Sequence, residues 1–128
     1  PLTTLIVSKA GNVRFEPLEP GEARAQVDTL LAAWQDGMGR PLPLAIKTAF
    51  AWLDGSSSAK SVYEGGYKLT GEVQSSPYLR RAWPDFETLT GDGEFARLAD
   101  SLLRPLFAAT FVESSRKRKA AAPAGEQA

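Results

Sequence analysis

The chain has neither cysteine nor histidine among its 128 residues. Without cysteine there is no disulfide scaffold and no thiolate metal site, and without histidine the commonest general base and metal ligand is missing. Nor is there an apolar run of about 18 residues, as a membrane span would need, or a basic start followed by an apolar stretch, as in a signal peptide. We therefore expect a cytosolic protein with no membrane contact, no metal and no cofactor of its own.

Charge is balanced overall, with 15 basic and 15 acidic residues, but it is unevenly placed. Near the end, four cations stand together as Arg116-Lys117-Arg118-Lys119, so acidic residues outnumber basic ones in the preceding chain. A domain that binds duplex DNA by itself usually carries a basic stripe, and none is visible outside this cluster. The cluster either attracts nucleic acid nonspecifically or serves as a solubilising tail.

The first elements are predicted to be a β-hairpin and a helix. Thr3 to Val7 is rich in β-branched residues, Gly11-Asn12 is a turn signal, and an extended pattern resumes after it, which indicates a hairpin over residues 3–17. An isolated hairpin is marginal in water, so it must pack on the helices or add to a sheet supplied by something else. From Glu22 apolar positions recur at helical spacing and predict a helix that ends before Gly37; they are Ala23, Val27, Leu30, Leu31 and Trp34.

Shorter helices are predicted after a rigid proline-containing connector at residues 40–43. The pattern indicates helices over residues 46–53 and 59–64, a loop over 66–75, and a helix that begins at Ser76-Pro77 and stops before Pro84. A last helix spans residues 95–107, and Pro105 should kink or divide it. The expected class is α+β, mainly α-helical with an N-terminal β-hairpin. We expect one domain over residues 1–113 and a disordered basic, alanine-rich tail over 114–128.

Several short segments occur in an order that is similar to one known family. They are Gly37-Met38-Gly39-Arg40-Pro41-Leu42-Pro43-Leu44, Ala49-Phe50-Ala51-Trp52, Val62-Tyr63-Glu64-Gly65, Pro77-Tyr78-Leu79-Arg80-Arg81-Ala82-Trp83 and the stretch from Phe95 to Phe107. Over roughly residues 3 to 112 the chain resembles the C-terminal end of the gamma subunit (RecC type) of bacterial exodeoxyribonuclease V. With its only methionine at Met38, the chain is expected to be a fragment of that larger subunit.

The resemblance implies the terminal part of a degenerate, catalytically inactive PD-(D/E)XK nuclease-like domain. Active members hold magnesium with an Asp and an Asp/Glu-x-Lys motif, whose metal activates the attacking water. Here the only lysine in the hairpin is Lys9, and Val7 stands where the motif needs a carboxylate. Glu16 and Glu19 form no carboxylate site, because no third ligand or basic partner is evident. We therefore expect no catalytic, cofactor-binding or metal-binding residue.

A role in DNA repair and recombination follows from the same resemblance. The implied complex is an ATP-dependent helicase-nuclease that processes double-stranded DNA ends, with ATP and magnesium bound in its alpha and beta subunits (RecD and RecB types). The chain would be a noncatalytic scaffold that holds these partners and helps to channel the split strands, with DNA nearby. The alternatives are a stand-alone helical adaptor and a residual magnesium-dependent nuclease.

Possible nucleic-acid contacts are few. Arg80 and Arg81 stand beside Trp83 in the sequence, and Arg116, Lys117, Arg118 and Lys119 form the tail cluster. A stacking platform for single-stranded bases needs exposed rings interleaved with cations. The aromatic residues coincide with apolar helical faces, so core packing is the favoured interpretation for them; they are Trp34, Trp52, Tyr63, Tyr78 and Trp83. For Arg80 and Arg81, surface ion pairs with Asp85 or Glu87 are the alternative.

Overall fold

A computed structural model of the protein describes residues 2–110. The elements are β1 (Thr4–Ser8), β2 (Gly11–Phe15), α1 (Pro20–Gly39), α2 (Ile46–Leu53), α3 (Ala59–Glu64), α4 (Glu72–Ser75), α5 (Pro77–Ala82), α6 (Phe86–Thr90), α7 (Glu94–Leu98) and the π-helical η1 (Ala99–Leu103). Helical turns continue over residues 104–110. The predicted class, mainly helical α+β with an N-terminal hairpin, is confirmed. The tail predicted for residues 114–128 lies outside the described residues.

The hairpin is an antiparallel pair whose register runs from Thr4 opposite Phe15 to Ser8 opposite Gly11. The predicted hairpin is confirmed, but the turn predicted at Gly11-Asn12 is wrong. The chain reverses two residues earlier, at Lys9-Ala10, and Gly11 opens β2 with φ +131°. A residue with a side chain rarely adopts that backbone conformation, so glycine suits this position at the end of the turn.

Helix α1 is longer than predicted at both ends. Pro20 occupies its first turn, where a missing N–H donor costs nothing. At the other end Gly37 does not stop the helix, because the backbone N–H of Arg40 still donates to the Asp36 carbonyl at 3.1 Å. The helix ends only before Pro41, which begins the predicted extended connector.

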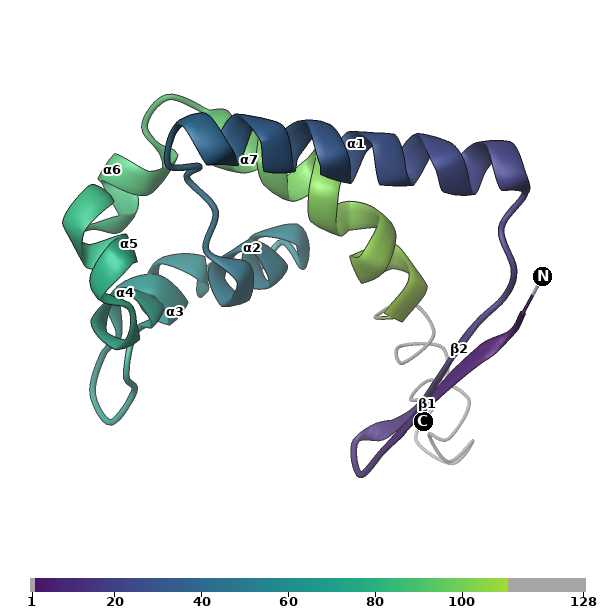
Figure 1. Ribbon diagram of the computed structural model, residues 1–128. Helices are drawn as coiled ribbons and strands as arrows, with labels where there is room; N and C mark the ends of the chain where they lie inside the picture. Colours follow the sequence, from purple (N-terminus) through teal and green to yellow (C-terminus); the bar gives the residue numbers. More distant parts are fainter. Residues whose placement is uncertain (1, 111–128) are drawn as a thin grey trace, which may run out of the picture.

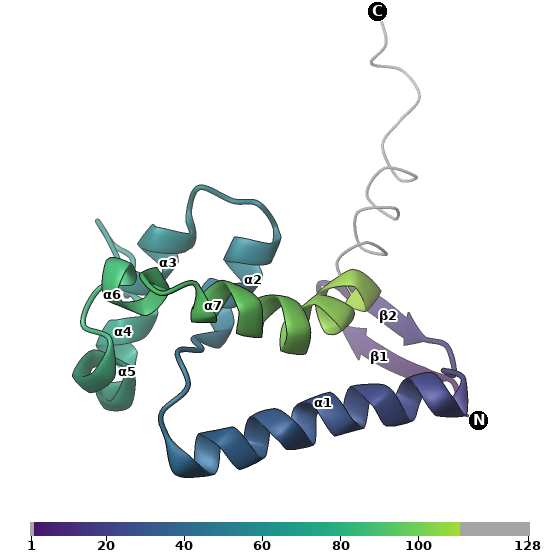
Figure 2. The ribbon, with the colours of Figure 1, turned by 90° about the horizontal axis from the view of Figure 1, so that it is seen from above.

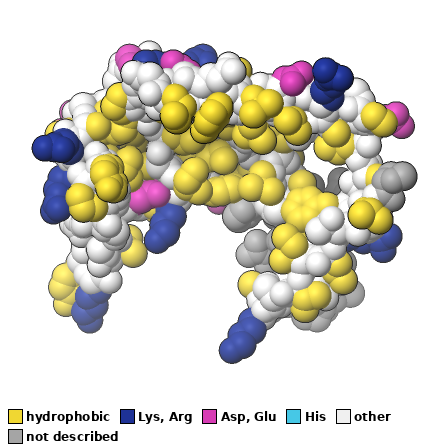
Figure 3. All heavy atoms as spheres, in the orientation of Figure 1, with side chains coloured by type: hydrophobic (Ala, Val, Ile, Leu, Met, Phe, Trp, Pro, Cys, Tyr) yellow, Lys and Arg dark blue, Asp and Glu magenta, His cyan; other side chains and the backbone are white. Residues whose placement is uncertain are grey.

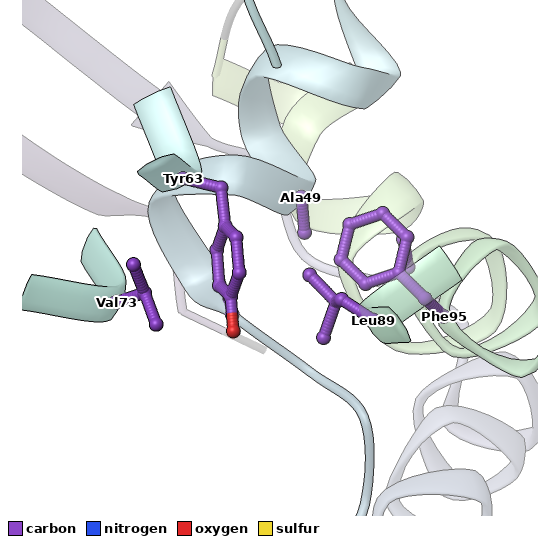
Figure 4. Close-up of a cluster of buried hydrophobic side chains, with 7 residues drawn as sticks. Ala49, Tyr63, Val73, Leu89 and Phe95 are labelled. Atoms are coloured by element: carbon purple, nitrogen blue, oxygen red, sulfur yellow. The ribbon is translucent and has the colours of Figure 1, made fainter. Parts of the chain in front are cut away.

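The hydrophobic core lies among the short helices that follow α1. Its buried members come from the segment 45–99: Ala45, Ala49, Tyr63, Val73, Leu89, Phe95 and Ala99. In Figure 4 the ring of Tyr63 stands between Val73 on one side and Leu89 on the other, with Phe95 beyond. No residue of α1 is buried, so α1 contributes nothing to this core.

Two short helices were not predicted. Helix α4 lies in the region expected to be a loop, and α6 follows Pro84. Helix α6 begins where the Asp85 carboxylate accepts a hydrogen bond from the Thr88 backbone N–H at 2.7 Å, a side-chain cap. Both helices have five residues or fewer, so they are too short for apolar periodicity to reveal them.

The last helix, where Pro105 was predicted to cause a kink or a division, changes from α to π geometry before Pro105 and then continues without a gap. The π-helical segment η1 precedes Pro105, and at its end the Arg104 backbone N–H donates to the Ala99 carbonyl five residues earlier. Proline has no N–H to donate and crowds the preceding turn, so the α-helical ladder cannot pass through it unchanged. Figure 1 shows the ribbon changing direction in this region.

The described part of the chain forms an arch (Figure 1). Helix α1 spans the top, the short helices form one limb, and the hairpin forms the other. From above, α7 and the turns after it run between α1 on one side and α2 and α3 on the other (Figure 2). The hairpin projects beyond the helical core, near the last described turns (Figures 1 and 2).

Candidate interaction surfaces

The most unusual surface is the apolar side of α1. Five large apolar side chains recur there at helical spacing, and at least half of each residue is exposed: Val27, Leu30, Leu31, Trp34 and Met38. We call this set the α1 apolar face. Figure 3 shows a row of hydrophobic side chains along the lower edge of the arch, over its hollow side. Burying one such side chain contributes about 1.5 to 3 kcal/mol, so this face leaves much stabilisation unused.

The hairpin also carries apolar side chains on both of its faces. The register places Ile6 with Val13 and Phe15 on one face, and Leu5 with Val7 on the other. Leu5, Ile6 and Val7 are all exposed. A strand pair that is apolar on both sides is typical of a sheet covered on both faces.

Arg40 ties α1 to the helical core. Its guanidinium pairs with Asp36 of α1 at 2.6 Å and also with Glu94 of α7. Arg97 adds a second contact to Glu94, at 3.3 Å. Hydrogen bonds from Arg40 hold the pKa values of the Asp36 and Glu94 carboxyls below their usual range. Arg40 and Asp36 are open to solvent, so the pairs fix the direction of α1 more than they stabilise the fold.

A second surface is an apolar groove of about 700 Å³ between the connector and α5. Residues 41–47 form one wall and residues 75–83 the other, and the lining includes Leu42, Leu44, Leu79 and Trp83. We call it the α5 groove. Its size falls within the usual range of ligand sites, and its lining is mostly apolar, as such sites usually are.

The floor of the α5 groove is held by Glu72, which reaches from α4 to the start of α2. Its carboxylate accepts hydrogen bonds from the backbone N–H groups of Lys47, at 3.1 Å, and Thr48, at 2.9 Å. It also accepts one from the buried Thr48 hydroxyl at 2.8 Å. Helix α2 has no side-chain cap of its own, so Glu72 supplies from a distance the negative charge that a helix N-terminus favours.

We expect Glu72→Ala to lower the free energy of unfolding by roughly 2 to 3 kcal/mol, because two N–H groups and a buried hydroxyl lose a charged acceptor. Chemical denaturation followed by circular dichroism measures the change. Glu87→Ala is the matched control, since that carboxylate is 86% exposed and its ion pair with Lys60 spans 3.9 Å. Equal denaturation midpoints for the two variants would contradict the role of Glu72 as a cap for α2.

Tyr63 braces the far wall of the groove. Its hydroxyl donates to the Trp83 carbonyl at 2.5 Å, which joins α3 to the residue that ends α5. Burial, with the negative charge of Glu72, Asp85 and Glu64, raises the pKa of Tyr63 to about 12. The hydroxyl therefore stays protonated at neutral pH and keeps its donor role.

Of the predicted nucleic-acid contacts, the structure describes only Arg80 and Arg81. Arg80 and Arg81 lie in the last turn of α5, both exposed, and Arg81 lines the α5 groove. The predicted ion pairs with Asp85 or Glu87 are wrong: Asp85 caps α6 and Glu87 pairs with Lys60. The cluster Arg116, Lys117, Arg118 and Lys119 lies outside the described residues.

The aromatic residues divide between core and surface. Tyr63 is fully buried, as predicted, and Trp83 packs against the core. Trp52 is partly exposed, with its ring 5.7 Å from that of Phe95. For Trp34 and Tyr78 the predicted core packing is wrong, because these side chains are 61% and 86% exposed. Sequence spacing gave no signal for this difference, since all five residues share apolar helical faces.

The acidic residues of the hairpin region offer no catalytic arrangement. Glu16 does have a basic partner, contrary to expectation: Arg14 Nε lies 2.6 Å from its carboxylate. Val7 lies in β1 and Lys9 in the turn. Within residues 2–110, no three acidic side chains gather as a group that could hold a metal ion. None of the helices in this stretch is long and apolar enough to cross a membrane.

Comparison with known families finds a match to the N-terminal part of the chain. Residues 2–57 match the family described as the RecC C-terminal domain. Over these residues the chain is similar to that family. No curated protein and no solved structure matches the chain.

The RecC match bears on the two surfaces differently. It covers the hairpin, the whole α1 apolar face and α2. It includes one wall of the α5 groove and stops before the other. The resemblance to RecC-type subunits is confirmed for residues 2–57, and for residues 58–112 it stays a prediction.

Proposed function

We propose that this chain is a noncatalytic scaffold domain of the gamma subunit of a bacterial exodeoxyribonuclease V. In this role it holds the alpha and beta subunits and helps to channel the split DNA strands during repair of double-stranded ends. ATP and magnesium act in the partner subunits. The hairpin and α1 are then the terminal part of a degenerate nuclease-like domain.

The observation that carries the proposal is the α1 apolar face. It lies within the segment that matches the RecC family, and none of its side chains is buried by the described part of the chain. A contiguous exposed apolar surface of this kind usually marks a protein interface. The hairpin beside it has apolar residues on both faces, as expected of strands that join a larger sheet.

Features of α1 and of the hairpin weigh against the two alternatives. A stand-alone helical adaptor should bury its longest amphipathic helix, and here α1 has no buried residue. A residual magnesium-dependent nuclease needs a carboxylate two positions before the lysine, and Val7 stands there. The scaffold role is therefore the function that the geometry supports best.

The test is gel filtration with light scattering of the chain mixed with the alpha subunit and, separately, with the beta subunit. We expect co-elution with at least one of them. Leu30→Glu with Trp34→Glu should abolish it, because two charges would enter an apolar interface.

The matched control is Ala25→Glu with Ala32→Glu, which adds the same charges to exposed positions on the opposite side of α1. This variant should co-elute as the original chain does. If the folded chain elutes alone with both subunits, the scaffold proposal is wrong. Equal loss in both variants would place the interface elsewhere.

A further inference from the structure

We propose that the α5 groove is a second docking site, which binds a short acidic and apolar segment of a partner protein. It is separate from the α1 apolar face, and it does not depend on the scaffold role. Its lining is apolar along both walls, and two residues on its lips, Ile46 and Tyr78, are exposed.

Charge identifies the kind of partner. Lys47 and Arg81 line the groove from opposite walls, and neither forms an ion pair with any residue in 2–110. The only acidic side chain in the lining, Glu72, is occupied by hydrogen bonds to the start of α2. The groove thus offers two cations that are unpaired within residues 2–110, beside a mostly apolar lining. A peptide with large apolar side chains and flanking carboxylates complements both features.

A nucleic-acid strand fits this lining less well. Its phosphates need a track of cations, and Lys47 and Arg81 stand on opposite walls with apolar residues such as Leu44 and Leu79 between them. Tyr78 offers one exposed ring, whereas Trp83 packs against the core. A stacking platform needs more than one accessible ring.

The groove is also braced from behind, which favours binding without rearrangement. Glu72 fixes the wall formed by residues 41–47, because it accepts hydrogen bonds at the start of α2. The hydrogen bond from Tyr63 to the Trp83 carbonyl fixes the opposite wall, at the end of α5. A preformed site loses less conformational entropy when a peptide binds.

The test uses two labelled helical peptides of about 14 residues, each with Leu and Phe at i, i+3, i+4 and i+7. One carries Glu at the flanking positions, and its twin carries Lys. Binding to the whole chain is measured by fluorescence anisotropy and mapped by amide chemical shifts. We expect the acidic peptide to bind with a dissociation constant of roughly 10 to 100 μM, with shifts at Leu42, Leu44 and Leu79.

Charge reversal decides between specific and nonspecific binding. Lys47→Glu with Arg81→Glu should weaken the acidic peptide about tenfold and strengthen the basic twin. Lys9→Glu with Arg24→Glu is the control: it changes net charge equally at exposed sites outside the groove lining and should leave the affinity unchanged. Thermal melting of each variant checks that the fold is intact.

Three outcomes would overturn the proposal. One is equal binding of both peptides, regardless of the groove variants, and another is no binding of either peptide to the folded chain. The third is displacement of the acidic peptide by single-stranded oligothymidine, with shifts at the same amides, which would make the groove a nucleic-acid site. The Leu30→Glu and Trp34→Glu variant should keep peptide binding, so this proposal and the scaffold role fail independently.

Discussion

Replacing Phe95 with alanine is expected to lower the free energy of unfolding by about 3 to 5 kcal/mol. Its side chain is completely buried, and its ring meets the edge of Trp52 at 5.7 Å between centroids. The substitution would leave a ring-sized cavity among the helices that surround the core. Urea denaturation followed by far-ultraviolet circular dichroism measures the loss.

Trp34→Ala is the matched comparison, because it also removes a large aromatic side chain. Sequence spacing predicts a core truncation here too, of about 3 to 5 kcal/mol. In the structure Trp34 is 61% exposed, so we now expect a change within about 0.5 to 1 kcal/mol. A large loss for Trp34 with a small loss for Phe95 would contradict the observed position of the core.

Gly71→Ala is expected to destabilise the fold by about 3 kcal/mol or more, at the upper end of overpacking effects. A Cβ atom at this position would lie 2.4 Å from the Tyr63 carbonyl oxygen and from the Gly65 nitrogen. Both are backbone atoms, so no side chain can move aside. The loop between α3 and α4 would have to open, and with it the packing of Tyr63. Thermal melting of the variant measures the effect.

Gly66→Ala is the control for this substitution. It lies in the same loop, and nothing is within 4 Å of the position that its Cβ would occupy. We expect its melting temperature to change little. If both variants melt at the same temperature, the close approach of the backbone at Gly71 does not exclude a side chain there.

The sequence predicted well those elements that depend on local chemistry. The extended connector after α1 and an irregularity of the last helix near Pro105 were both predicted, because proline restricts the backbone wherever it stands. Helix α5 begins as predicted, where the Ser76 hydroxyl accepts a hydrogen bond from the Leu79 N–H at 3.4 Å. Local signals were insufficient for α4 and α6, because a helix of one turn carries no readable period.

The two candidate surfaces could be predicted only in part. Sequence spacing revealed that α1 has an apolar side, but periodicity is the same whether that side is buried or exposed. The α5 groove had no sequence signal, because its walls are about 30 residues apart in the chain and only the tertiary structure brings them together. Arg81 was singled out for its position beside Trp83, whereas Lys47 on the opposite wall was missed.

By itself the sequence determined the hairpin, the main helices, the proline breaks and the relationship to RecC-type subunits, now confirmed over residues 2–57. These follow from backbone restriction, from residue order and from apolar spacing, which all act locally along the chain. Only the tertiary structure decided which apolar residues form the core. Burial depends on which helices meet, so Tyr63 and Phe95 are enclosed while Trp34, with the same local pattern, is exposed.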